Sequence, residues 1–105
     1  MRRKDAHTKA VLRFVNRIRK DKLKLQPLDD LECGSEANAA WCPIANSLIC
    51  GAEDRLTAST YTTIIVDSYN YDWDMGEVHV SIDTPQYVKH WMDRFDNGRI
   101  PEYVC

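Results

Sequence analysis

The sequence predicts a single α+β domain, residues 1–105, in which helices pack on one face of a small antiparallel sheet in the order α-α-β-β-α. Apolar residues recur at helical spacing near both ends of the chain, at 5–22 and 85–97, and predict the two longer helices. Between them lie two runs rich in β-branched residues, at 58–66 and 77–83, which are too close together for a crossover helix and therefore predict antiparallel strands. A chain of 105 residues has room for one domain.

The first helix is expected over residues 5–22. Ala10, Phe14 and Ile18 recur every four residues, and Val11 and Val15 lie beside them. This stripe is expected to face the core. At about 100° per residue, the opposite side of the helix carries a set of cations: Lys9, Arg13, Arg17 and Lys20.

A short helix is expected over residues 43–50, after an irregular connection at 26–40. Pro43 suits the first turn of a helix, and Gly51 suits the position just after its end. Trp41 directly precedes this helix, and we expect it to be an anchor of the core.

The two strands are expected at 58–66 and 77–83. The first reads as one continuous β-branched and aromatic strand. The second alternates in polarity, which predicts that Val78, Val80 and Ile82 face the core.

The last helix is expected over residues 85–97. Thr84 is a good N-cap, Pro85 suits the first helical position, and Gly98 suits the end of the helix. Its buried stripe is expected to consist of Val88, Trp91, Met92 and Phe95.

The four cysteines, Cys33, Cys42, Cys50 and Cys105, allow three disulfide pairings. Because no secretory signal is recognisable after Met1, the expected location is the cytoplasm, where thiols stay reduced. We therefore expect free thiols, with Cys50 acting as a small hydrophobic residue. No two cysteines have the close spacing of a structural zinc site, so no metal and no cofactor is predicted. Cys33 and Cys42 are the weak candidates if a metal does bind.

Catalytic motifs are absent from the sequence: there is no glycine-rich phosphate loop, no His-Glu-x-x-His, no Gly-x-Ser-x-Gly and no Cys-x-x-Cys. The sequence therefore favours a protein that is not an enzyme. An uncharacterised enzyme or metal protein is a minor alternative, for example with Cys42 and His79 as a nucleophile and its base.

Charge is strongly segregated along the chain. Residues 1–24 contain ten basic and two acidic residues, whereas residues 25–105 contain four basic and fourteen acidic ones. Such asymmetry predicts either an anionic partner for the first segment or its neutralisation by the rest of the chain. If the partner is nucleic acid, the candidate contacts are Lys9, Arg13, Arg17 and Lys20.

A second candidate surface is the aromatic and acidic stretch from Asp67 to Glu77. Tyr69, Tyr71 and Trp73 are two residues apart and would share one face of an extended chain. Aromatic rings of this kind are frequent at the energetic centres of protein interfaces. The alternative is that they cover an edge of the sheet. The candidate residues for binding a protein partner are Tyr69, Tyr71, Trp73, Asp72 and Asp74.

Two further stretches carry a resemblance: Cys33-Gly34 followed by Trp41-Cys42-Pro43-Ile44-Ala45-Asn46, and the ending Phe95-Asp96-Asn97-Gly98-Arg99-Ile100-Pro101-Glu102-Tyr103-Val104. Together they resemble small hypothetical proteins encoded by bacteriophages of actinobacteria, over about the last two-thirds of the chain. The resemblance implies no catalytic residues. It implies expression inside a bacterial host and a small intracellular interaction protein, a phage accessory factor that binds and modulates a host protein. A nucleic-acid-binding module that uses the first helix is the alternative, and no membrane partner is expected.

Overall fold

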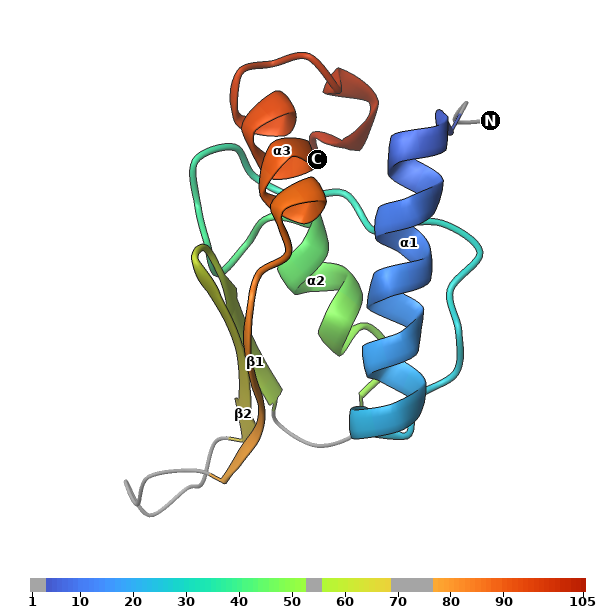
Figure 1. Cartoon of the computed structure of the whole chain (residues 1–105), viewed down its shortest axis with the longest axis vertical. Coiled ribbons are helices and arrows are strands. Elements are labelled where there is room, and N and C mark those ends of the chain that lie inside the picture. The colour runs from blue at the N-terminus through green and yellow to red at the C-terminus, as the bar shows by residue number, and fades with distance from the viewer. Residues whose placement is uncertain (1–3, 53–55, 69–76) are drawn as a thin grey trace.

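The computed structural model describes residues 4–52, 56–68 and 77–105 (Figure 1). It confirms the α+β class, with a three-stranded antiparallel sheet in place of the expected pair of strands. The elements are α1 (Ala6–Ile18), the π-helical turn η1 (Arg19–Leu23), α2 (Pro43–Ile49), β1 (Leu56–Thr60), β2 (Thr63–Ser68), β3 (Val78–Asp83), α3 (Gln86–Asp96) and the 3₁₀ turn η2 (Pro101–Tyr103).

Helix α1 begins where the sequence predicts and buries part of the predicted stripe, with Ala10 half-buried. The Asp5 carboxylate caps it by accepting the Thr8 backbone N–H at 2.7 Å. Val11, Val15 and Ile18 are buried in the core, and Phe14 packs against it half-buried. The helix continues directly into η1 and so extends the expected helix to residue 23.

The expected single strand at 58–66 is wrong, because the chain reverses at residues 61–62 and forms the hairpin of β1 and β2. In this hairpin Thr60 pairs with Ile64, and Ala58 pairs with Val66. Thr62 belongs to the same β-branched run as the strands, and no Gly, Asn, Asp or Pro marks the turn. Composition alone therefore could not show where the chain turns.

Strand β3 pairs antiparallel with β2, as expected, but its alternation is interrupted. Val66 is opposite Val80 while the next residue, Asp67, is opposite Val78, so His79 is an additional residue that forms a β-bulge. The bulge moves Val78 to the outer face of the sheet, where 57% of it is exposed. The prediction that Val78 is buried was wrong for this reason, whereas Val80 is buried and Ile82 packs against the core.

Helix α3 buries Val88, Trp91 and Phe95, and Met92 packs beside them. Its N-cap is Pro85, in extended conformation, and not Thr84 as predicted. Thr84 is buried, and within the described part of the chain its hydroxyl has no hydrogen-bond partner.

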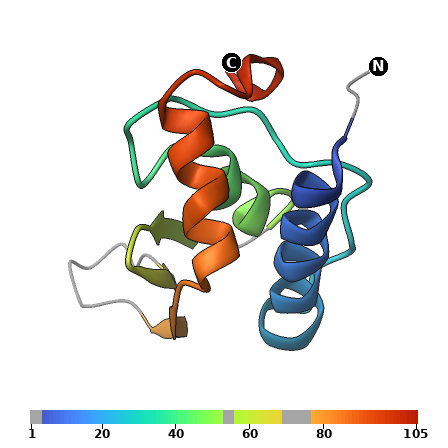
Figure 2. The same cartoon turned by 45° about the horizontal axis from the view of Figure 1, so that its top comes forward.

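The core lies where the elements meet on one face of the sheet. Figures 1 and 2 place α2 between α1 and the sheet, with α3 packed across one end. The Trp91 ring stacks on Phe95 and meets Tyr103 edge-on, with ring centroids 5.8 and 5.7 Å apart. Trp41 is 62% exposed, so the prediction of a core anchor at this position was wrong. Its neighbour Cys42 is buried instead and caps α2 through its sulfur.

A disulfide joins Cys33 to Cys105 and fixes the C-terminal segment, with 5.0 Å between the two Cα atoms. Beside it, the Gly34 N–H donates to the Tyr103 carbonyl at 2.8 Å, and the Cys105 N–H donates to the Gly34 carbonyl at 3.1 Å. The expectation of free thiols was wrong for this pair, because residues 72 positions apart meet only in the folded chain. Cys42 and Cys50 are free. No helix in the described ranges is long and apolar enough to cross a membrane.

Candidate functional site

The outer face of the continuous helix formed by α1 and η1 presents the four predicted nucleic-acid contacts. Lys9, Arg13, Arg17 and Lys20 are all exposed, on the side of the helix opposite the buried Val11 and Val15. Since the buried side is anchored in the core, the cations project from a fixed backbone.

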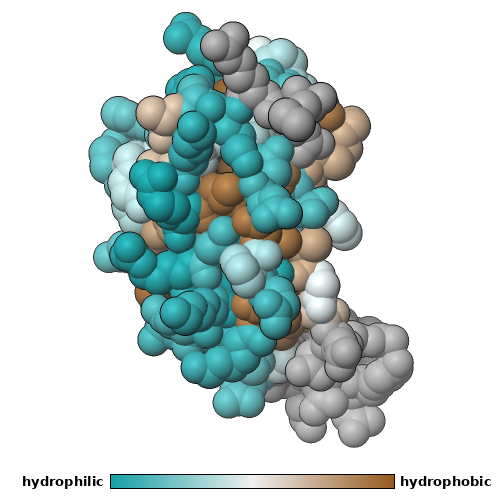
Figure 3. Space-filling view, turned by 90° about the vertical axis from the view of Figure 1, so that its right-hand side faces the viewer, coloured by the Kyte–Doolittle hydropathy of each residue, from teal (hydrophilic) through white to brown (hydrophobic). Residues whose placement is uncertain are grey.

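A groove of about 840 Å³ follows this face. Its walls are α1 with η1 and the chain that returns beside them at residues 24–27, and Lys24 adds a further cation. Figure 3 shows the side of the molecule on which α1 and this returning chain lie, and hydrophilic residues cover most of it. The groove is lined by four basic residues, Arg13, Arg17, Lys20 and Lys24, and by one acidic residue, Asp21.

The returning chain is tied to the helix by a paired contact of Asn16. Its side-chain amide donates to the Leu28 carbonyl at 3.0 Å and accepts the Leu28 N–H at 2.8 Å. The turn between the walls is closed by the Leu25 N–H, which donates to the Arg19 carbonyl at 2.8 Å, and by Lys24 in the left-handed conformation. Both walls of the groove are therefore held together by hydrogen bonds.

Direct ion pairing does not neutralise the groove within the described part of the chain. The salt bridge there joins Arg94 to Asp5, with 2.8 Å between Nη2 and Oδ2, and involves none of the groove cations. An anion that binds in the groove would therefore not have to displace a carboxylate partner, and the hydrogen bond of these cations within the described residues is the one from Lys24 Nζ to the Asp21 carbonyl at 3.2 Å.

Arg19 lies on the same helix but on its buried side, and it is a structural residue that sequence reasoning missed. Its Nη1 donates to the carbonyls of Ser47 and Cys50 at 2.7 and 2.8 Å, and its Nε donates to Gln26 O at 2.9 Å. The bonds to Ser47 and Cys50 satisfy carbonyls at the C-terminal end of α2, and burial lowers the Arg19 pKa. The signal was present in the sequence: Arg19 is four residues after the buried Val15, on the apolar stripe.

A second charged cluster ties the start of α1 to α3. Arg94 donates to the Asp5 carboxylate and also contacts His7 Nδ1 at 2.8 Å, while His7 Nε2 lies 2.6 Å from the Tyr87 carbonyl. The hydrogen bond from Arg94, together with the Thr8 N–H, holds the Asp5 pKa well below its usual range. These charged contacts therefore hold the start of α1 against α3.

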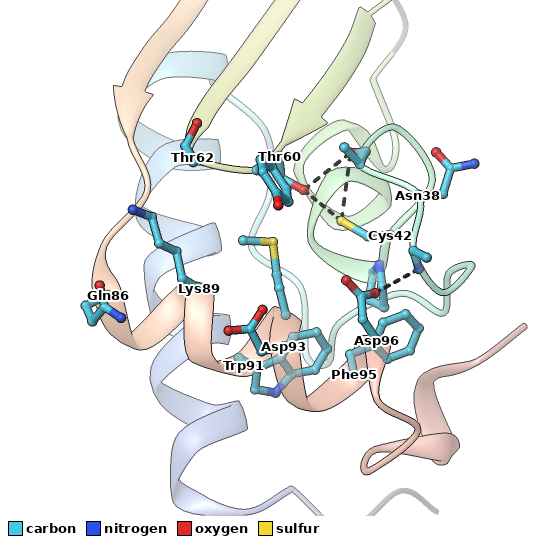
Figure 4. A pocket seen from close by; sticks show the side chains of 15 residues that line it. Asn38, Cys42, Thr60, Thr62, Gln86, Lys89, Trp91, Asp93, Phe95 and Asp96 are labelled. Atoms are coloured by element: carbon cyan, nitrogen blue, oxygen red, sulfur yellow. Dashed lines mark hydrogen bonds between the residues drawn. The ribbon is translucent and has the colours of Figure 1, made fainter.

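A second cavity, of about 570 Å³, lies between α3, the β1–β2 turn and residues 37–43 (Figure 4). Cys42 and Thr60 point toward each other there, with 2.8 Å between sulfur and hydroxyl. His79, the base considered for Cys42, is exposed on the bulge of β3, whereas the hydrogen-bond partners of the buried Cys42 sulfur are Ala39, Thr60 and Ala45. The structure therefore does not bring the suggested Cys–His pair together.

The structure describes some of the remaining predicted site residues and not others. Cys33 is in the disulfide, so it offers no thiolate to a metal, and Cys50 is half-buried with its thiol donating to Glu32 at 3.3 Å. Burial and this hydrogen bond raise the Cys50 pKa. No cluster of three or more His, Cys, Asp or Glu residues suited to a metal occurs among the residues described. The aromatic and acidic candidates Tyr69, Tyr71, Asp72, Trp73 and Asp74 lie outside the described residues.

No family model, curated protein or solved structure matches the chain.

Proposed function

We propose that this protein acts by binding rather than by catalysis, and that the basic groove of α1 binds the phosphate backbone of a nucleic acid. The observation that carries the proposal is the row of four cations, Arg13, Arg17, Lys20 and Lys24, which line one groove without ion-pair partners among the described residues. Phosphate contacts made by such cations release counterions and supply most of the affinity of sequence-independent binding.

The rigidity of the groove supports the same conclusion. The helix is anchored by Val11, Val15 and Ile18, and its second wall is held by Asn16. A cation on a fixed backbone loses less conformational entropy on binding than one on a mobile segment. The acidic remainder of the chain is compatible with binding if it faces away from the nucleic acid.

Charge reversal in the groove tests the proposal. Arg13→Glu combined with Arg17→Glu is expected to weaken binding to a fluorescein-labelled DNA by at least about 100-fold at 100 mM salt. The control variant combines Lys89→Glu with Arg99→Glu, which changes the net charge equally but outside the groove. Equal loss of anisotropy signal in both variants would show that only the net charge matters and would contradict the proposal.

A protein partner is the second candidate function, and exposed aromatic rings favour it. Tyr61 is 73% exposed at the rim of the second cavity, and Trp41 is exposed nearby in sequence on the 37–43 segment. The resemblance to phage proteins makes a bacterial host protein the proposed partner. In a pull-down from host lysate, Tyr61→Ala should then lose a partner that the Arg13→Glu, Arg17→Glu variant keeps. Loss in the charge variant alone would assign the interaction to the groove.

We further propose that the protein works in the cytoplasm; the Cys33–Cys105 disulfide of the structure argues against this location, because it would have to open under reducing conditions. The C-terminal segment would then be held by Tyr103, which is buried against Trp91, and by the Gly34 hydrogen bonds. When cells are quenched with acid and the protein is alkylated under denaturing conditions, which also expose the buried Cys42, we expect all four cysteines to be modified. Modification of only Cys42 and Cys50 would place the protein in an oxidising compartment.

A further inference from the structure

We propose that the ligand of the basic groove is a double-stranded nucleic acid, held by its backbone without base-specific contacts. This inference rests on the proposed function and names the class of nucleic acid. It follows from the kinds of residue that line the groove and from the burial of the apolar face of α1 in the core.

The groove offers charge but no stacking surface. None of its lining residues is aromatic; its apolar side chains are Leu25 and Pro27. Proteins that hold single strands combine a basic groove with aromatic rings on which successive bases stack, at about 1–3 kcal/mol per base. A duplex needs no such rings, because its bases stay stacked on each other and its phosphates are presented on the outside.

The groove offers few side chains besides its cations that could read base edges. Its arginines and lysines can meet either phosphates or guanine, and the exposed Gln26 amide is the one that the fold leaves unused among the described residues. Amide side chains are the usual readers of adenine, and the two in the groove are Asn16 and Gln26. Both functions of the Asn16 amide are occupied by the Leu28 backbone. The four cations therefore dominate the contact, and cations that meet phosphates position a protein without selecting a sequence.

An anionic membrane is excluded as the ligand by the other side of α1. A helix that binds a membrane surface inserts an apolar face between the lipids. In this helix that face consists of Val11, Val15 and Ile18, which are committed to the core. The exposed side is mainly charged, with Leu25 and Pro27 as the apolar residues of the groove, and it would bind lipid headgroups weakly.

The test compares a 20-bp duplex, a 20-nucleotide oligothymidine and vesicles containing phosphatidylserine, each titrated with the full chain at 100 mM salt. We expect the duplex to bind about tenfold or more tightly than oligothymidine, and unrelated duplex sequences to bind within about threefold of one another. Arg13→Lys combined with Arg17→Lys should keep most of the duplex affinity, because it keeps the charge. Circular dichroism and thermal unfolding of each variant confirm that it is folded.

The other possible results of these titrations would contradict different parts of the proposal. Equal or tighter binding of oligothymidine, still lost on charge reversal at Arg13 and Arg17, would overturn the duplex inference and leave the proposed function in place. A strong preference for one duplex sequence would contradict the inference that the protein makes no base-specific contacts. Binding to vesicles alone, or to none of the three probes at 50 mM salt, would overturn the proposed function together with this inference.

Discussion

Arg17 and Arg19 are two residues apart on one continuous helical segment, yet the structure gives them opposite roles. Arg17 is exposed in the groove and forms no ion pair within the described residues. Arg19 is only 3% exposed and donates to four backbone carbonyls. The difference follows from their angular positions, since Arg19 continues the stripe of Val11 and Val15. One face of this helix therefore stabilises the fold, and the other is available for a ligand.

The largest effect on stability is expected in the core against which the buried face of α1 packs. Trp91 packs on Phe95 and Tyr103, and its indole N–H donates to the Thr8 hydroxyl on α1 at 3.0 Å. Trp91→Ala should lower the free energy of unfolding by about 3–5 kcal/mol through the cavity that it leaves. Chemical denaturation of the parent and of Trp91→Ala measures this difference in the free energy of unfolding. A loss below about 1 kcal/mol would contradict the assignment of Trp91 to the centre of the core.

The two arginines give the sharpest comparison. Arg19→Ala leaves the buried carbonyl of Ser47 and the partly buried carbonyl of Cys50 without this donor and should cost about 2–4 kcal/mol of stability. Arg17→Ala removes an exposed cation and should change stability by less than about 0.5 kcal/mol. Equal effects of the two changes on the unfolding midpoint would show that the faces are not distinct.

A smaller effect is expected from pH at the start of α1. The Asp5 pKa is lower in the folded chain than the unfolded value of about 3.9, so Asp5 contributes stability above pH 4 and loses it as the pH falls toward the folded value. Because both Asp5 and Arg94 are partly exposed, with 49% and 34% of their side chains accessible, this contribution is below about 1 kcal/mol. Asp5→Asn should therefore be less stable than the parent at pH 6, and the difference should shrink by pH 2. If the difference in stability between Asp5→Asn and the parent is the same at every pH, the ionisation of Asp5 is not its cause.

The helices could be predicted from the sequence because their signals are local. The period of α1, the Pro43 start of α2 and the Gly98 end of α3 depend on residues within a few positions of each element. The β1–β2 turn and the His79 bulge could not be predicted, because strand pairing decides them and the residues themselves are typical of strands.

The candidate site was predictable in part for the same reason. The basic face of α1 follows from helical spacing alone, and the structure leaves it exposed. The second wall of the groove depends on Asn16 meeting Leu28 across a turn, and the disulfide depends on distant Cys33 and Cys105. The burial of Arg19 was readable from its angle on the helix, but the residue type suggested a surface position.

The salt dependence of duplex binding tests the role of the exposed face most directly. Four phosphate contacts predict that the logarithm of the binding constant falls with the logarithm of salt concentration at a slope of about −3.6. Arg17→Ala should reduce the magnitude of that slope by about 0.9, while Arg99→Ala, outside the groove, should leave it unchanged. A slope that is the same in the parent and in both variants would contradict phosphate binding by the basic face of α1.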